Sequence, residues 1–177
     1  MNANQILDAI ARKHSQCALV REVVVEDVDR RAAQQAFYKH QHPGFGAKYY
    51  PDAEDYVEEK HGRILDTHRP FRRIDGLMLD GGGTRTAIEV KISRADFLRE
   101  TDEKRRPWQR ITNRFVYAAP AGLLRPDEIP DGCGLWEISE HGAVTIARKA
   151  RGNRNPDPIP HQVLVALAYR LTKRGDH

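Results

Sequence analysis

Three charged residues near the middle of the chain are of the types that metal-assisted phosphodiester hydrolysis uses. Glu89, Val90 and Lys91 follow one another in an apolar run, and Asp75 lies in an earlier apolar run. Two carboxylates and the backbone carbonyl of Val90 would supply the hard oxygen ligands that Mg²⁺ or Mn²⁺ prefers. Such an ion polarises a phosphate and lowers the pKa of a bound water, and a lysine orients that water. The residue types therefore indicate a metal-dependent phosphodiesterase.

A β-hairpin is needed to bring these side chains together. Arg73–Leu79 and Thr84–Ile92 have the composition of strands, and the glycines of Asp80–Gly83 predict a tight turn between them. When this hairpin closes, Asp75 lies across from the region of Glu89. We therefore expect two carboxylates and one ammonium to converge at the end of a sheet.

The spacing of Glu89 and Lys91 predicts a catalytic site only together with the elements around it. Alternate residues of a strand share a face, so these two side chains project together while Ile88, Val90 and Ile92 face the core. The alternative is an exposed ion pair on a solvent-facing strand, which contributes little to stability. An Asp followed by Glu-x-Lys is common by chance. Two apolar strands, a glycine turn and a basic helix directly after them favour the catalytic interpretation.

The rest of the chain predicts helices packed on a sheet. The predicted helices are Asn4–Lys13, Asp29–Tyr38, Arg94–Thr112 and His161–Lys173, and the other predicted strands are Ala18–Val25, Arg114–Ala119, Gly134–Ile138 and Ala143–Ala147. This order predicts a single α/β domain over residues 1–177, with a mixed central sheet flanked by helices. A helical and loop insertion at about 29–69 follows the first strand.

Several motifs occur in a fixed order from about residue 72 to about residue 142. They are Arg73-Ile74-Asp75, Ala87-Ile88-Glu89-Val90-Lys91, Ser93-Arg94-Ala95-Asp96-Phe97, Asp102-Glu103-Lys104, Asn113-Arg114-Phe115-Val116-Tyr117-Ala118-Ala119-Pro120 and Cys133-Gly134-Leu135-Trp136. This order resembles the PD-(D/E)xK nuclease superfamily, which has the restriction-endonuclease-like fold. Within it, the chain is similar to the MmcB-like DNA repair proteins and related phage nucleases. Pro51-Asp52 spells the family name but opens a separate predicted helix.

The resemblance implies roles for individual residues. Asp75 and Glu89 match the metal ligands of the family, and Lys91 matches its catalytic lysine. The implied enzyme is a deoxyribonuclease that uses Mg²⁺ or Mn²⁺ in DNA repair, recombination or phage DNA processing. The alternative is a catalytically silent nucleic-acid-binding subunit with the same fold, and a third option is an enzyme that acts on small phosphoesters.

Further residues are candidates for the metal site and for contact with nucleic acid. Glu22 in the first predicted strand is a candidate for an additional metal ligand, with Asp8 as its rival; the alternative for Glu22 is simple exposure. The candidates for contact with nucleic acid are Arg73, Lys104, Arg105, Arg106, Gln109 and Arg110. Most of them belong to the predicted basic helix, for which the alternative interpretation is a solvated face.

Composition limits the remaining choices. Hydrophobic residues make up 40% of the 177 residues and charged residues 31%, which predicts a globular domain that does not span a membrane. The net charge of +4 and the pI of about 9.2 are compatible with DNA as the partner. The histidine and cysteine spacings match no structural zinc pattern.

Motifs for other functions are lacking in the sequence. No Walker A loop and no dinucleotide fingerprint occur, so we expect no nucleotide cofactor. No basic and apolar secretory signal is present at the start of the chain, so the cytoplasm is the expected compartment. The sequence leaves open whether the protein forms a homodimer.

Overall fold

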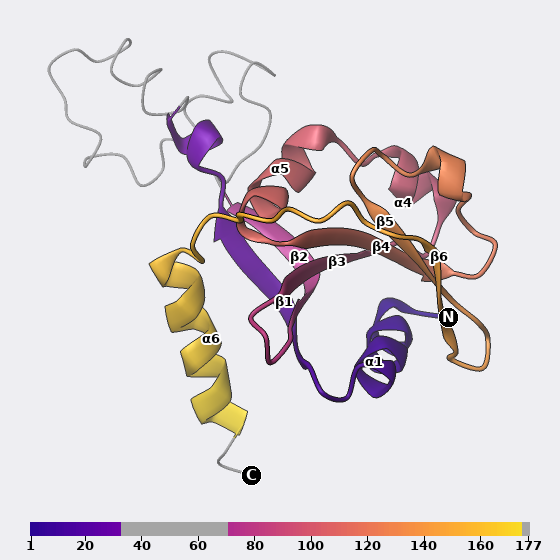
Figure 1. Cartoon of the computed structure of the whole chain (residues 1–177), viewed down its shortest axis with the longest axis horizontal. Helices are drawn as coiled ribbons and strands as arrows, with labels where there is room; N and C mark the ends of the chain where they lie inside the picture. Colours follow the sequence, from indigo (N-terminus) through magenta and orange to yellow (C-terminus); the bar gives the residue numbers. More distant parts are fainter. Residues whose placement is uncertain (33–70, 175–177) are drawn as a thin grey trace, which may run out of the picture. The chain divides into compact units, whose positions relative to one another are not determined.

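A six-stranded mixed sheet forms the centre of the protein in a computed structural model (Figure 1). The structure describes residues 1–32 and 71–174, with side chains as far as residue 170. The strands are β1 (Ala18–Glu26), β2 (Phe71–Leu79), β3 (Arg85–Val90), β4 (Arg114–Pro120), β5 (Gly134–Ile138) and β6 (Val144–Arg148), and they lie in this order across the sheet. β3, β4 and β5 are parallel, whereas β2 runs antiparallel to β3 and β6 antiparallel to β5.

The turn between β2 and β3 forms as the glycines predict. The Asp80 side chain accepts hydrogen bonds from the backbone N–H groups of Gly82 at 2.9 Å and Thr84 at 2.8 Å. Gly83 has a φ of +83°, a conformation that residues with a Cβ rarely adopt. The hairpin therefore closes with Leu79 opposite Arg85 and Gly76 opposite Ile88.

Helices cover both faces of the sheet. α1 (Ala3–Lys13) begins at a capping box between Asn2 and Gln5. It packs on one face, where the buried residues are Ile6, Leu7, Ala9, Ile10, Met78, Ile88, Val90, Val116, Ala118, Trp136, Ile138 and Val144. On the other face, α4 (Arg94–Leu98) and α5 (Asp102–Ile111) contribute Phe97, Trp108 and Ile111 to a core with residues such as Ala87, Phe115, Tyr117 and Leu135. The expected mixed α/β sheet with flanking helices is confirmed.

The helix predicted over Arg94–Thr112 is two helices instead. α4 is capped by Ser93, and α5 starts anew at Thr101, whose hydroxyl accepts a hydrogen bond from the Lys104 N–H. Thr101 is followed by acidic residues, which favour a helix start. The break turns Glu100 toward the sheet. β3 also ends at Val90, before the predicted boundary, so Ile92 is half-exposed rather than buried in the core.

The remaining elements are a short 3₁₀ helix, η3 (Pro126–Glu128), and α6 (His161–Arg174). The chain divides into two units, Met1–Val25 with Arg73–His177, and Glu26–Arg72. The bounds of the second unit lie close to those of the predicted insertion at about 29–69. The structure describes only the first residues of this insertion, and residues 28–32 are helical. The rest of the predicted helix Asp29–Tyr38 and the Pro51-Asp52 pair lie outside the described residues. Among the described helices, none has the length and apolarity to cross a bilayer.

Candidate metal-dependent hydrolytic site

Asp75 and Glu89 meet where the hairpin opens. The pairing of β2 with β3 ends at Gly76 and Ile88, and the same register continued by one residue puts Asp75 opposite Glu89. The charge of Asp75 indeed acts on the Glu89 carboxyl. Residues directly opposite one another in an antiparallel pair share a face of the sheet. The predicted convergence of these two carboxylates is therefore present.

The end of β3 also brings the Val90 backbone to this place. The Val90 N–H donates a hydrogen bond of 2.8 Å to Asp75 Oδ2, so a side chain takes the place of a strand partner. The N–H and C=O of one strand residue point toward the same edge. The Val90 carbonyl is therefore expected to face the β2 side as well.

Lys91 lies beside Glu89 and is almost completely buried. Its side chain is 4% exposed, and its ammonium lies 2.9 Å from Glu89 Oε1 and 2.7 Å from Glu100 Oε2. Asp96 Oδ2 lies further away, at 3.6 Å. The Lys91 N–H donates to the Ala118 carbonyl of β4 at 2.9 Å, which fixes the backbone from which this side chain projects.

Burial and mutual repulsion shift the pKa values of these groups. Burial raises the pKa of Glu89 to about 7, the charge of Asp75 adds to the rise, and Lys91 opposes it. Burial likewise raises the pKa of Asp75, against the Val90 N–H and the charge of Lys91. For Lys91, burial lowers the pKa, but the charge of Glu89 and the hydrogen bonds with Glu100 and Glu89 outweigh it and raise the pKa above its usual range.

This group of charges is suited to a divalent cation. When all are ionised, the four carboxylates of Asp75, Glu89, Asp96 and Glu100 outnumber the three cations that act on them, Lys91, Arg73 and Arg99. A cation near Asp75 and Glu89 would reduce the repulsion between these two carboxylates. Among the described residues, no three His, Cys, Asp or Glu side chains are grouped so that they could hold a metal ion. Two carboxylates and one carbonyl do fit Mg²⁺, which usually keeps several waters and takes few protein ligands.

Glu100 and Asp96 are parts of this site that the sequence interpretation missed. Glu100 has only 7% of its side chain exposed, and it contacts Lys91 from the turn between α4 and α5. Helical periodicity across Arg94–Thr112 gives no reason to single out this residue. The helix start at Thr101, followed by Asp102 and Glu103, is the local pattern that would have revealed the break and the inward turn.

The structure does not bring Glu22 and Asp8 into this group. The Glu22 side chain is 66% exposed, and its carboxylate lies 3.8 Å from the Arg73 guanidinium. Asp8 pairs with Arg21 at 2.5 Å. Arg73 lies close enough to Asp75 for its charge to act on that carboxyl and oppose the rise in its pKa.

The predicted nucleic-acid residues of α5 divide into two groups. Arg105 is buried, where its guanidinium pairs with Asp102 and donates to the Tyr117 hydroxyl at 3.2 Å. The Gln109 amide donates to the Cys133 thiol at 3.5 Å. Arg105 and Gln109 thus serve the interior of the fold. The others are exposed: Lys104, whose ammonium donates to the Arg99 carbonyl, Arg106, and Arg110, which pairs with Asp157 at 3.3 Å.

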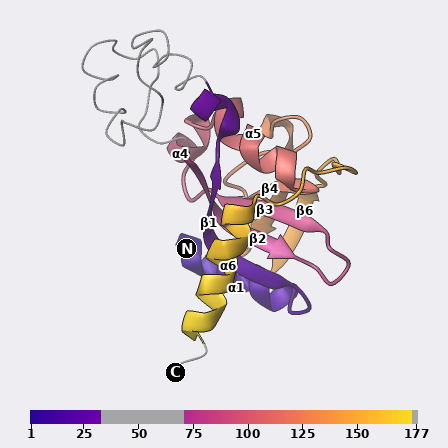
Figure 2. The same cartoon turned by 90° about the vertical axis from the view of Figure 1, so that its left-hand side faces the viewer.

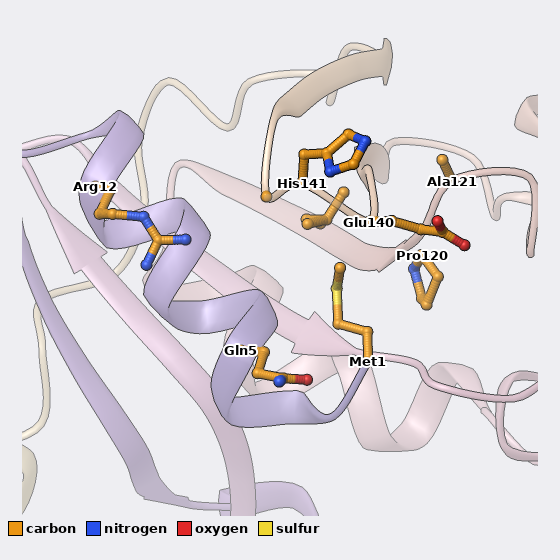
Figure 3. A pocket seen from close by; sticks show the side chains of 9 residues that line it. Met1, Gln5, Arg12, Pro120, Ala121, Glu140 and His141 are labelled. Atoms are coloured by element: carbon orange, nitrogen blue, oxygen red, sulfur yellow. The ribbon is translucent and has the colours of Figure 1, made fainter.

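A cavity of about 580 Å³ lies at a different place (Figure 3). Its lining comes from α1 and the residue before it, the end of β4, and the end of β5 with the turn that follows: Met1, Gln5, Arg12, Pro120, Ala121, Ile138, Glu140, His141 and Gly142. None of the residues predicted for catalysis contributes to it. The carboxylate and lysine group is therefore distinct from this cavity.

Comparison with known proteins adds little to this picture. No family model and no curated protein matches the chain. One solved structure, described as "SPO1766 protein of unknown function from Silicibacter pomeroyi", is similar at 25% sequence identity and a TM-score of 0.44. The match covers 59% of this chain and 71% of that chain.

Proposed function

We propose that this protein is a divalent-metal-dependent deoxyribonuclease that hydrolyses phosphodiester bonds in DNA repair, recombination or phage DNA processing. The observation that carries the proposal is the position of Asp75 opposite Glu89, with the Val90 backbone and Lys91 beside them. The resemblance of the motif order to the PD-(D/E)xK nucleases supports it.

Each residue has a distinct task in this proposal. Asp75, Glu89 and the Val90 carbonyl would hold Mg²⁺ or Mn²⁺, and the ion would supply polarisation of the scissile phosphate and a lowered pKa of a bound water. An ammonium has three N–H donors. Glu89 and Glu100 accept from two of those of Lys91, which leaves one for the attacking water or a phosphate oxygen. Burial of Lys91 fixes the direction of its ammonium and strengthens its charge interactions.

The direct test is cleavage of labelled DNA by purified protein. Single-stranded, duplex, flapped and branched DNAs should be incubated with Mg²⁺, Mn²⁺ or a chelator. We expect cleavage that needs the divalent ion and that falls roughly 100-fold or more in Glu89→Gln and in Lys91→Ala. Asp8→Asn, which removes an exposed carboxylate from α1, is the matched control and should cleave like the unmodified protein. Undiminished cleavage by both active-site variants would refute the assignment.

One observation favours the catalytically silent alternative. The Lys91 ammonium is already bonded to two carboxylates, as in a purely structural ion-pair network. Binding to DNA that weakens steeply with salt, without cleavage under any divalent ion, would select this alternative. Inhibition of cleavage by nucleotides but not by DNA would instead indicate an enzyme of small phosphoesters.

A further inference from the structure

Two distant segments of the chain, both rich in basic residues, are joined at the C-terminal end of α5. The connection from β6 to α6 passes beside this helix (Figures 1 and 2). Asn153 of this connection makes two hydrogen bonds near the end of α5. Its backbone N–H donates to the Asn113 carbonyl, just after the helix, at 2.8 Å, and its side-chain amide donates to the Gln109 carbonyl, within the helix, at 3.2 Å. The Asp157 N–H donates to the Arg110 carbonyl at 2.8 Å. The connection is therefore fixed to the helix.

This attachment creates a surface that we call the basic ledge, formed by Arg106 and Arg110 of α5 and by Arg151 and Arg154 of the connection. All four are exposed. Arg110 pairs with Asp157 at 3.3 Å. Within residues 1–32 and 71–170, the side chains of Arg106, Arg151 and Arg154 have no carboxylate within ion-pair distance. Among these described residues, the three arginines are therefore available to a negatively charged partner.

We propose that the basic ledge binds the sugar–phosphate backbone of the DNA substrate, an inference that rests on the proposed nuclease function. Arginine guanidinium groups suit phosphate oxygens, and the asparagines beside them are common donors to the backbone of nucleic acids. Between Arg151 and Arg154 the connection contains only Gly152 and Asn153. This short stretch has no exposed apolar side chain that would insert into a lipid surface.

The position of the ledge relative to the carboxylates fits this partner. α5 begins at Asp102, two residues after Glu100, which contacts Lys91, and its 10 residues run from there to the ledge. A helix of this length extends about 15 Å, which corresponds to roughly four or five base-pair steps of a duplex. A strand with one phosphate at Lys91 therefore has other phosphates within reach of the ledge.

The proposal is tested by fluorescence anisotropy with a labelled duplex in EDTA, so that binding is measured without cleavage. The test variant is Arg151→Gln with Arg154→Gln, which keeps the backbone N–H groups that fix the connection, including the one that Arg151 donates to the Gly132 carbonyl at 3.0 Å. The control is Arg21→Gln with Arg125→Gln, which removes the same charge from elsewhere. Two lost phosphate contacts should reduce the steepness of log Kd against log salt by about 1.8. The lost contacts should also raise Kd roughly 60-fold at about 0.1 M salt. Each phosphate contact strengthens binding about eightfold when the salt concentration falls from about 1 M to about 0.1 M, and two contacts are lost.

Several outcomes separate this proposal from the proposed function. Weaker binding by the test variant alone, with unchanged thermal unfolding, supports the ledge. If both double variants bind DNA like the unmodified protein, the ledge is refuted while the nuclease proposal stands. If cleavage is absent in Mg²⁺ but ledge-dependent binding is observed, the nuclease proposal fails and the ledge stands. If the test variant loses binding to phosphatidylserine vesicles and keeps that to DNA, the ledge serves a membrane and the proposal is wrong.

Discussion

Replacement of Glu89 by glutamine should stabilise the metal-free protein above neutral pH, although it removes a residue that we place in the active site. Burial and the charge of Asp75 raise the pKa of Glu89 to about 7, despite the ion pair with Lys91. Glutamine has nearly the same shape and no charge. It removes the repulsion from Asp75 and keeps an oxygen that accepts a hydrogen bond from Lys91.

The sign of this effect follows from proton linkage. As the pH rises from about 4.5 to about 7, the unfolded chain loses the Glu89 proton before the folded protein does. The stabilising contribution of this proton is fully present below about pH 4.5 and is lost as the pH rises through about 7. The pKa of Glu89 rises from 4.5 in the unfolded chain to about 7 in the folded protein, which corresponds to at most about 3 kcal/mol of free energy of unfolding. This is an upper limit because 20% of the side chain is still exposed to water, which screens its charge.

The assay is urea unfolding in EDTA at several pH values for Glu89→Gln and the unmodified protein. The free energies of unfolding should agree at about pH 4.5, where Glu89 is protonated, and differ by about 2–3 kcal/mol at about pH 8.5 in favour of the variant. Glu140→Gln, an exposed change in the turn between β5 and β6, is the control and should give a flat difference. A flat difference for Glu89→Gln, or a less stable variant at high pH, would refute the electrostatic reasoning.

Three other changes test Glu100, the metal ligands and the packing of β5. Glu100→Gln should lower kcat for DNA cleavage roughly tenfold with little change in KM, because Lys91 loses a carboxylate that fixes its ammonium. Partial recovery of kcat in Glu100→Asp would show that Glu100 positions Lys91, whereas a packing defect would not be relieved by the shorter carboxylate. Mg²⁺ at about 100 times its Kd should raise the free energy of unfolding of the unmodified protein by about 3 kcal/mol and leave that of Asp75→Asn unchanged. Equal shifts of the unfolding temperature in both proteins would show that the ion binds elsewhere. Gly134→Ala should destabilise the fold by about 1–3 kcal/mol because its Cβ would lie 2.6 Å from Val116 Cγ1. Gly152→Ala, with nothing within 4 Å of its Cβ, should unfold at the same temperature as the unmodified protein.

Local rules were sufficient for the hairpin that carries Asp75 and Glu89. Strand alternation predicts that Glu89 and Lys91 share a face, and the glycines after Asp80 predict a turn that places Asp75 across from them. Both follow from backbone geometry over a few residues, and the structure agrees. The roles of Asp75, Glu89 and Lys91 in catalysis remain predictions.

Burial of particular charges could not be predicted in the same way. Arg105 and Arg106 are neighbours of the same type on α5, yet one is buried against Tyr117 and the other is exposed. Which of them turns inward depends on the angle at which the helix packs on the sheet. The contact of Glu100 with Lys91 likewise depends on the break before α5.

The sequence by itself therefore determined that Asp75, Glu89 and Lys91 come together and that a hairpin joins them, because both depend on short-range periodicity and turn chemistry. Only the tertiary structure decided what surrounds the lysine and which arginines form the basic ledge. Those features join segments far apart in the chain, such as α5 and the connection before α6, and their proximity arises from packing and from hydrogen bonds such as those of Asn153.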